Sequence, residues 1–190
     1  MVSAAMLDDG SAVAAKFRRT DSKRQSLEGE GRLLEVASRA GASPRPLFYF
    51  SDIIVMEYVG MMSLGRLMAE APSPLIAEAM LEAIRAARAL DLAEVLHAEL
   101  HRPLRNIFFP AWPYSLKAEV IDLESASRGC GNVNKVLSFL VSRGLIKADK
   151  DLDFKLRDYR SLGCPQGLYK DLEKAVTQAL KASILLNDLA

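Results

Sequence analysis

The apolar pattern of the sequence changes near residue 65, and this change constrains the fold more than any other feature. Before residue 65, apolar residues come in short runs bounded by polar or turn residues, which predicts β-strands. Asp8-Asp9-Gly10 separates the first two runs and has the composition of a hairpin turn. A helical stretch at residues 22–40 interrupts the runs, and Gly41 can end it. The predicted strands are residues 2–7, 12–17, 47–50 and 53–59.

After residue 65 the pattern is mostly helical. A long apolar-rich helix is expected to start at Pro72-Ser73-Pro74, and strands return only briefly, at residues 107–109 and 118–121. The layout predicts an α+β fold, in which a small sheet with one helix precedes a helical body. The predicted helices of that body are residues 72–90, 134–141 and 171–186.

Composition narrows the class of protein. A chain of 190 residues suits one compact domain, or two small lobes that share a cleft. The formal net charge of +1 gives no excess of basic residues of the kind that nucleic-acid-binding proteins have, so direct nucleic-acid binding is not expected. Cys130 and Cys164 lack CxxC spacing, and we interpret them as free thiols in a reducing compartment. Without a signal-peptide pattern or an apolar run of ~18 residues, the sequence predicts a cytoplasmic protein that does not enter a membrane.

Lys16 and Glu30 form the first candidate pair. Lys16 ends the run AVAAKF, where a lone lysine usually faces solvent. Glu30 lies fourteen residues later in a predicted helix and could equally belong to a solvated acidic face. Together they predict a strand lysine held by a helix glutamate, an arrangement that can place the ammonium group against phosphate oxygens.

Two further strands end in polar groups. The run IIVMEYVG is apolar enough to form a buried strand. Where this strand leaves the sheet, its backbone N–H and C=O groups need other hydrogen-bond partners. The edge of a flat heterocycle could supply them. Asp122 follows the second short strand and could be either a turn cap or a ligand of a divalent cation. Asn106 precedes the first short strand and offers an amide oxygen. Antiparallel pairing of the two strands would bring Asn106 and Asp122 to one cleft.

Zinc and dinucleotide sites are not expected. His97 and His101 could share a helix face, but Ala98 stands where the metalloprotease pattern needs glutamate. The HxE of a zinc deaminase needs a downstream PCxxC, which is missing. The glycine pairs also lack the third glycine of a dinucleotide fingerprint.

Taken in order, these residues resemble the motifs of the protein-kinase superfamily over roughly residues 2–146. VAAK (13–16) looks like the VAxK strand, VMEYV (55–59) is similar to the hinge, HAEL (97–100) resembles the HRDL catalytic loop, and IDLE contains the counterpart of the DFG aspartate. The resemblance implies ATP-binding residues Ala14, Lys16, Glu30, Met56 as gatekeeper, Glu57 and Val59; catalytic residues Glu99 and Lys16; and metal-binding residues Asn106 and Asp122.

The narrower likeness is to the predicted archaeal Ser/Thr kinases related to the RIO kinases and the kinase of the KEOPS complex. It rests on HxEL followed by RP, on IDLESAS, and on GNVNKVLSFLV. It implies a two-lobed kinase-like fold, with a truncated N-terminal β-sheet lobe at 1–60 and a larger helical lobe at 61–190. The implied ligands are ATP with Mg²⁺ or Mn²⁺, and the implied partner is an unknown protein substrate or regulated protein.

The sequence also departs from the kinase pattern. No glycine-rich loop precedes VAAK, so the chain is expected to begin at the second strand of the small lobe. Glu99 replaces aspartate and lies seven residues before Asn106, where the motif has five. Leu123-Glu124 replaces the Phe-Gly after the metal-binding aspartate. Two functions therefore stand: an atypical Ser/Thr kinase, or a pseudokinase that regulates a partner.

Overall fold

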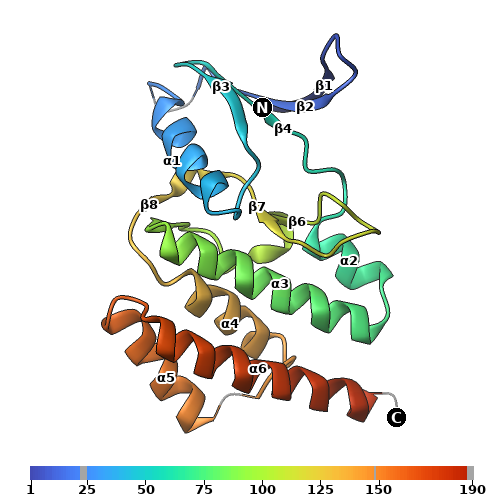
Figure 1. Ribbon diagram of the computed structural model, residues 1–190, viewed down its shortest axis with the longest axis vertical. Coiled ribbons are helices and arrows are strands. Elements are labelled where there is room, and N and C mark those ends of the chain that lie inside the picture. Colours follow the sequence, from blue (N-terminus) through green and yellow to red (C-terminus); the bar gives the residue numbers. More distant parts are fainter. Residues whose placement is uncertain (22–24, 148, 188–190) are drawn as a thin grey trace.

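The structure is a computed structural model and describes residues 1–21, 25–147 and 149–187. It confirms the α+β prediction. A four-stranded antiparallel sheet and one helix lie at one end of the molecule, and the remaining helices form the other end (Figure 1). The strand order is β1-β2-β4-β3, with β1 at Val2–Met6, β2 at Ala12–Phe17, β3 at Pro46–Tyr49 and β4 at Ile53–Glu57.

The predicted hairpin is confirmed. Strands β1 and β2 pair antiparallel, and the turn between them is closed by a hydrogen bond from Leu7 N to Ser11 O. Asp9 Oδ1 accepts from Ser11 N at 2.9 Å, and Gly10 has a φ of 84°, which suits glycine. The turn therefore fixes the register of β2, the strand that carries Lys16.

Helix α1 spans Glu28–Arg39, so it begins later than predicted; residues 22–24 lie outside the described chain. Ser26 Oγ accepts from Glu28 N at the helix start, and Gly41 follows the helix end with a φ of 71°, as predicted. An added Cβ at Gly31 would lie 2.3 Å from the Tyr49 ring. Glycine at this position therefore lets α1 pack closely on β3.

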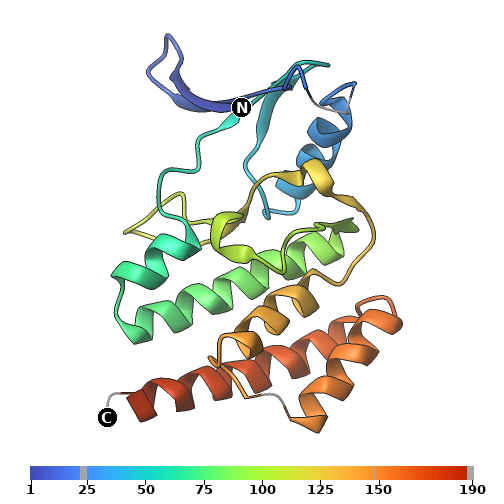
Figure 2. The same cartoon turned by 180° about the vertical axis from the view of Figure 1, so that it is seen from behind.

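The helical body is built on α3, which packs against both α4 and α6 (Figure 2). Two of its helices were not predicted. Helix α2 is only 7 residues long, and α5 is mostly polar, with Leu152 and Tyr159 as its buried side chains. Their starts are set by side-chain caps at Ser63 and Asp149. The helices are α2 Leu64–Glu70, α3 Ser73–Leu92, α4 Asn132–Ser142, α5 Lys150–Ser161 and α6 Gln166–Asn187.

Two small two-stranded sheets lie between the main sheet and the helices. The predicted antiparallel pairing of the two short strands is confirmed, since β6 (Ile107–Phe108) pairs with β7 (Glu119–Val120). A second pair, β5 (Val95–Leu96) with β8 (Ser127–Arg128), has only two residues per strand and gives no sequence pattern. One hydrophobic core runs from α1 and β4 through α3 to α4 and α6. No helix in the described part of the chain has the length and apolar character to cross a membrane.

Cys130 and Cys164 form a disulfide bond, so their interpretation as free thiols is wrong. Cys130 precedes α4 and Cys164 lies in the loop between α5 and α6, with 6.4 Å between their Cα atoms. The 34-residue separation gives no hint of pairing, because the two cysteines meet only when α5 and α6 pack onto the body. In the chain-entropy view such a cross-link stabilises by about 3–4 kcal/mol. The inference of a reducing compartment therefore loses its basis.

Candidate functional site

Lys16 lies on β2, an interior strand of the sheet. Side chains alternate between the two faces of a strand, so Lys16 shares a face with Ala14. Ile54 and Met56 stand opposite these two residues on β4. Only 8% of Lys16 is exposed. The alternative in which Lys16 simply faces solvent is therefore wrong.

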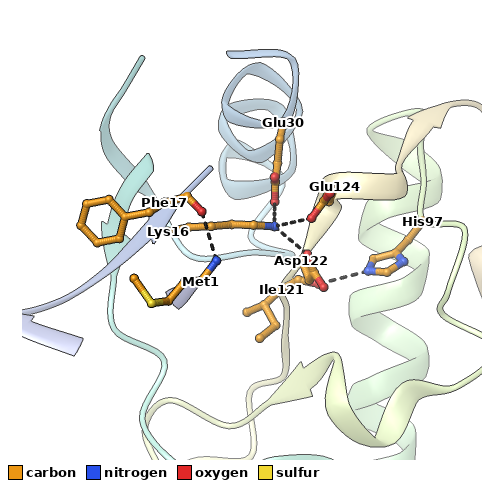
Figure 3. Close-up of polar contacts among 8 residues, drawn as sticks. All are labelled: Met1, Lys16, Phe17, Glu30, His97, Ile121, Asp122 and Glu124. Carbon is orange, nitrogen blue, oxygen red and sulfur yellow. Dashed lines mark hydrogen bonds and ion pairs between the residues drawn. The ribbon is translucent and has the colours of Figure 1, made fainter. Parts of the chain in front are cut away.

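Three carboxylates surround the Lys16 ammonium group (Figure 3). Glu30 Oε1 on α1 is 2.8 Å from Lys16 Nζ, and Asp122 Oδ1 is 2.7 Å away on the opposite side. Glu124 Oε2 is 3.3 Å from the same nitrogen. The predicted pair of a strand lysine and a helix glutamate is confirmed, and the fold adds Asp122, which is 106 residues further along the chain than Lys16.

Three carboxylates lie within 3.3 Å of one ammonium group. Burial alone would lower the pKa of Lys16, but the charge of Glu30 and the hydrogen bond with Asp122 outweigh it and raise the pKa. Burial raises the pKa of Glu30, and Lys16 offsets this only in part since Asp122 and Glu124 repel its charge. The pKa values of Lys16 and Glu30 therefore both lie above their ordinary values.

Asp122 has a left-handed backbone, with φ 63° and ψ 59°. Its side chain makes no capping hydrogen bond to the turn Leu123–Ser125 that follows, so the turn-cap alternative is wrong. A left-handed non-glycine residue costs on the order of 1–3 kcal/mol and is often found at functional sites. Here the backbone turns the carboxylate towards Lys16, and the ion pair between them helps to hold it.

The hairpin β6–β7 pairs as predicted, but Asn106 and Asp122 line different cavities and not the one cleft that the sequence led us to expect. Val120 stands opposite Ile107, and Ile121 N donates to Asn106 O at 2.9 Å. Asn106 therefore lies beside the residue that precedes Asp122. Among the described residues, no group of three or more His, Cys, Asp or Glu side chains could hold a metal ion by itself.

His97 links the loop after β5 to the strand that carries Asp122. Its Nδ1 accepts from Glu99 N at 3.1 Å, which leaves Nε2 to donate to Ile121 O at 3.0 Å (Figure 3). Burial lowers the pKa of His97 and keeps the ring neutral, in the tautomer that these two bonds require. His97 and His101 lie in a turn and not on one helix face. His97 is therefore a positioning residue for both Glu99 and Asp122.

Side chains of α4 hold the backbone of the same loop, the one that carries His97 and Glu99. Asn132 Oδ1 accepts from His97 N at 2.9 Å, and Lys135 Nζ donates to Ala98 O at 3.1 Å. Glu99 O accepts from Arg102 N at 2.9 Å, which closes the turn. Glu99 itself is left exposed at the top of this turn. The backbone of the loop is fixed while its carboxylate remains accessible.

Two separate cavities are lined by six of the predicted site residues, and Ala14, Glu57 and Val59 line neither of them. Lys16, Glu30, Met56 and Asp122 line a cavity of about 260 Å³, together with Glu124 and the first residues of the chain. Glu99 and Asn106 line a separate cavity of about 630 Å³. The turn Pro103–Arg105 lies between Glu99 and Asn106, and both residues line this cavity.

The predicted hinge, residues 55–59, spans the end of β4 and the two residues after it. The Glu57 side chain is exposed and pairs with Arg45. Val59 is buried, and its N–H has no backbone partner in the described part of the chain. A backbone donor without a backbone partner is a feature expected of a site for the edge of a heterocycle.

Several contributors were missed by sequence reasoning. Glu124 lies two residues after Asp122 and joins the Lys16 cluster through the short turn at Leu123–Ser125. Asn132 and Lys135 lie three residues apart on one face of α4. The predicted helix, residues 134–141, begins after Asn132, so the sequence did not place these two residues together.

Comparison with known proteins gives no family assignment, because neither a protein-family model nor a curated protein matches the chain. Evidence about function therefore comes from the site itself.

Proposed function

We propose that the chain is an atypical, RIO-like ATP-dependent kinase that transfers the γ-phosphate of ATP to a serine or threonine hydroxyl. In this proposal Lys16 contacts the phosphates and Glu30 holds Lys16. Asn106 and Asp122 would hold Mg²⁺ or Mn²⁺, and Glu99 would accept the proton of the acceptor hydroxyl. The single observation that carries the proposal is the convergence of Lys16, Glu30 and Asp122 at 2.7–2.8 Å.

The arrangement of the elements supports the same proposal. The sheet with α1 would be the small lobe, residues 1–60, and the helical body would be the large lobe, residues 61–190 (Figure 1). The Lys16 cluster lies where α1, β2 and the turn after β7 meet, which is between these two parts. A nucleotide bound there would contact both lobes, with the free N–H of Val59 beside the adenine edge.

The donor set suits a magnesium ion shared with phosphate oxygens. Mg²⁺ is usually bound by one or two carboxylates with substrate phosphates and water, and not by an all-protein cage. Asp122 supplies a carboxylate and Asn106 an amide oxygen, both of which are hard ligands. When bound, the ion would neutralise charge that develops on the transferred phosphoryl group.

A pseudokinase is the second candidate. The cavity at Lys16 measures about 260 Å³, below the roughly 300–1,000 Å³ typical of ligand sites, and the Lys16 ammonium group that lines it is paired with Asp122. Such a protein would bind a regulated partner without efficient phosphoryl transfer. The two candidates differ in turnover, so the nucleotide-binding tests below need to be read together with the activity of Glu99 variants.

ATP with Mg²⁺ is expected to raise the melting temperature of the protein. A ligand at ~100 times its Kd stabilises the native state by about 2.7 kcal/mol, or about 5–11 °C for a chain of this size. Lys16→Met should remove most of that shift, because the phosphate contact is lost. Differential scanning fluorimetry with and without nucleotide measures the effect.

Two controls protect this measurement. Lys16→Met leaves Glu30 buried without its cation, so the double variant Lys16→Met/Glu30→Gln removes both charges and keeps the protein folded. Lys174→Ala, on the exposed face of α6, should keep the full ATP shift. If the wild-type protein shows no shift at millimolar ATP with magnesium, the nucleotide site proposed here does not exist.

Asp122→Asn is expected to remove the magnesium dependence of ATP binding. The amide keeps the shape of the side chain but lacks the negative charge that a divalent cation needs. In a magnesium titration at fixed ATP, followed by isothermal calorimetry, the variant should need at least ~10-fold more metal, since charge-assisted contacts are worth about 1.5–3 kcal/mol. Asn106→Ala should have the smaller effect, and a wild-type titration curve for Asp122→Asn would exclude Asp122 as a ligand.

A further inference from the structure

The cavity beside Glu99 and Asn106 is larger than the one at Lys16, and it is lined by cations. Its volume is about 630 Å³, and its walls come from the loop 99–106 and from the end of α4. Phe139 and Leu104 supply apolar wall, and Arg143 stacks over the Phe139 ring with 5.5 Å between the guanidinium carbon and the ring centroid. The three cationic side chains are Arg102, Arg105 and Arg143.

Some arginines of the described chain are paired, as Arg39 and Arg66 are with a glutamate four residues away, and others, such as Arg128 and Arg157, are not. What sets Arg102, Arg105 and Arg143 apart is that they share one cavity with Glu99. Within the described residues, Arg102, Arg105 and Arg143 have no carboxylate partner. Planar guanidinium groups bind carboxylates and phosphates through two parallel hydrogen bonds. The cavity is therefore built to receive an anionic group.

We propose that this cavity selects a phosphoacceptor whose hydroxyl is flanked by anionic groups, in an acidic segment of a protein. The inference rests on the proposed kinase function, because it places the acceptor hydroxyl at Glu99. Glu99 is the one carboxylate that lines the cavity, and the arginines surround it. An acidic side chain next to the acceptor would pair with the arginines and bring the hydroxyl to the Glu99 carboxylate.

A protein segment fits the surroundings better than nucleic acid. Nucleic-acid binding relies on an extended basic surface that follows many phosphates. Here the formal net charge is only +1, and the unpaired arginines at Glu99 are gathered in one cavity of limited volume. That volume suits one or two side chains of a peptide.

The test is a binding measurement without nucleotide. Three labelled peptides carry one central serine, flanked by glutamates, by glutamines or by phosphoserine and glutamate, and binding is followed by fluorescence anisotropy at low salt. The glutamate peptide is expected to bind at least ~10-fold more tightly than the glutamine peptide, and added salt should reduce the difference, since exposed charges are screened. The phosphoserine peptide shows whether phosphate or carboxylate is the preferred anion.

Variants locate the site. Arg102→Gln, Arg105→Gln and Arg143→Gln should each weaken binding of the glutamate peptide by about threefold to tenfold, and the triple variant should bind all peptides alike. Arg157→Gln is the matched control, because Arg157 is also exposed and lines a different cavity on α5. Its binding should equal that of the wild type.

The outcomes separate this inference from the proposed function. Equal binding of the glutamate and glutamine peptides, or an unchanged preference in the triple variant, would overturn the inference. Tighter binding of a uridine oligonucleotide than of the acidic peptides would overturn it in favour of RNA. Because no arm contains ATP, an acidic preference without an ATP-dependent melting shift would keep this site and reject the kinase proposal, and the reverse result would reject only this site.

Discussion

Replacing Glu99 with glutamine is expected to lower turnover by at least ~10²-fold, because general-base catalysis is worth ~10²–10⁴-fold in rate. Glutamine keeps the size and hydrogen bonding of the side chain but loses the basic oxygen. Glu99 is exposed in a loop whose backbone is fixed by His97 and α4, so the substitution should leave the fold and the ATP-dependent melting shift unchanged. Autophosphorylation and ATP hydrolysis measure the loss.

Glu99→Asp is the second variant of this experiment. It restores the residue usual in kinases but shortens the reach by one methylene. The turn Pro103–Arg105 sets the position of Asn106 relative to Glu99, and small misplacements of a catalytic group reduce rate. Loss of activity in Glu99→Asp would indicate that the site is built around glutamate.

Glu78→Gln, on an exposed position of α3, is the matched control and should retain full activity. If the wild type and Glu99→Gln turn over ATP at the same rate, Glu99 is not the catalytic base. An ATP-dependent melting shift without measurable turnover in the wild type would instead favour the pseudokinase.

Sequence patterns predicted the parts of the fold that are made locally. The hairpin β1–β2, helices α1, α3, α4 and α6, and the pairing of β6 with β7 each follow from apolar periodicity or from turn residues. Helix α2 is short and α5 is mostly polar, so their stability comes from packing and caps that periodicity does not show. The pairing of Cys130 with Cys164 is also a tertiary result, which explains why the free-thiol interpretation failed.

The site was predicted in part for the same reason. Lys16 and Glu30 belong to neighbouring elements, and their ion pair could be inferred from the order of a buried strand and a helix. The contact between Lys16 and Asp122 joins residues 106 apart and requires the turn after β7 to reach β2. The arginines beside Glu99 come from two separate segments of the sequence, and only the fold shows that they share a cavity.

Asp91→Ala is expected to destabilise the protein by about 3–5 kcal/mol, because it removes the centre of a buried polar network. Asp91 is 4% exposed at the end of α3. Its Oδ1 accepts from Gly131 N, Asn132 N and Asn132 Nδ2 at 2.7–2.8 Å. Its Oδ2 accepts from Val133 N at 3.2 Å and from Tyr159 Oη at 2.9 Å.

The size of the effect follows from what the substitution leaves behind. The first N–H groups of α4 would lose the carboxylate that caps them and complements the helix dipole, and each buried donor without a partner costs about 1–3 kcal/mol. Arg88 donates to Tyr159 Oη at 2.8 Å and to Cys164 O at 2.6 Å, so this buried cation would lose the nearest negative charge of its network. Total stability is about 5–15 kcal/mol for a typical domain, which makes the expected loss a large fraction.

Thermal and urea unfolding measure the change, with an expected fall in melting temperature of about 6–20 °C for Asp91→Ala. Asp91→Asn is the graded variant, because it keeps one accepting oxygen but turns an amide donor towards Val133 N or Tyr159 Oη. Asp171→Ala, at an exposed position of α6, should have a free energy of unfolding within ~0.5 kcal/mol of the wild type. Since Asn132 bridges Asp91 to His97 N, the folded Asp91→Asn variant should also lose activity while it keeps ATP binding. If Asp91→Ala is as stable as the wild type, the network does not stabilise the fold. If Asp91→Asn turns over ATP at the wild-type rate, the network does not position the Glu99 loop.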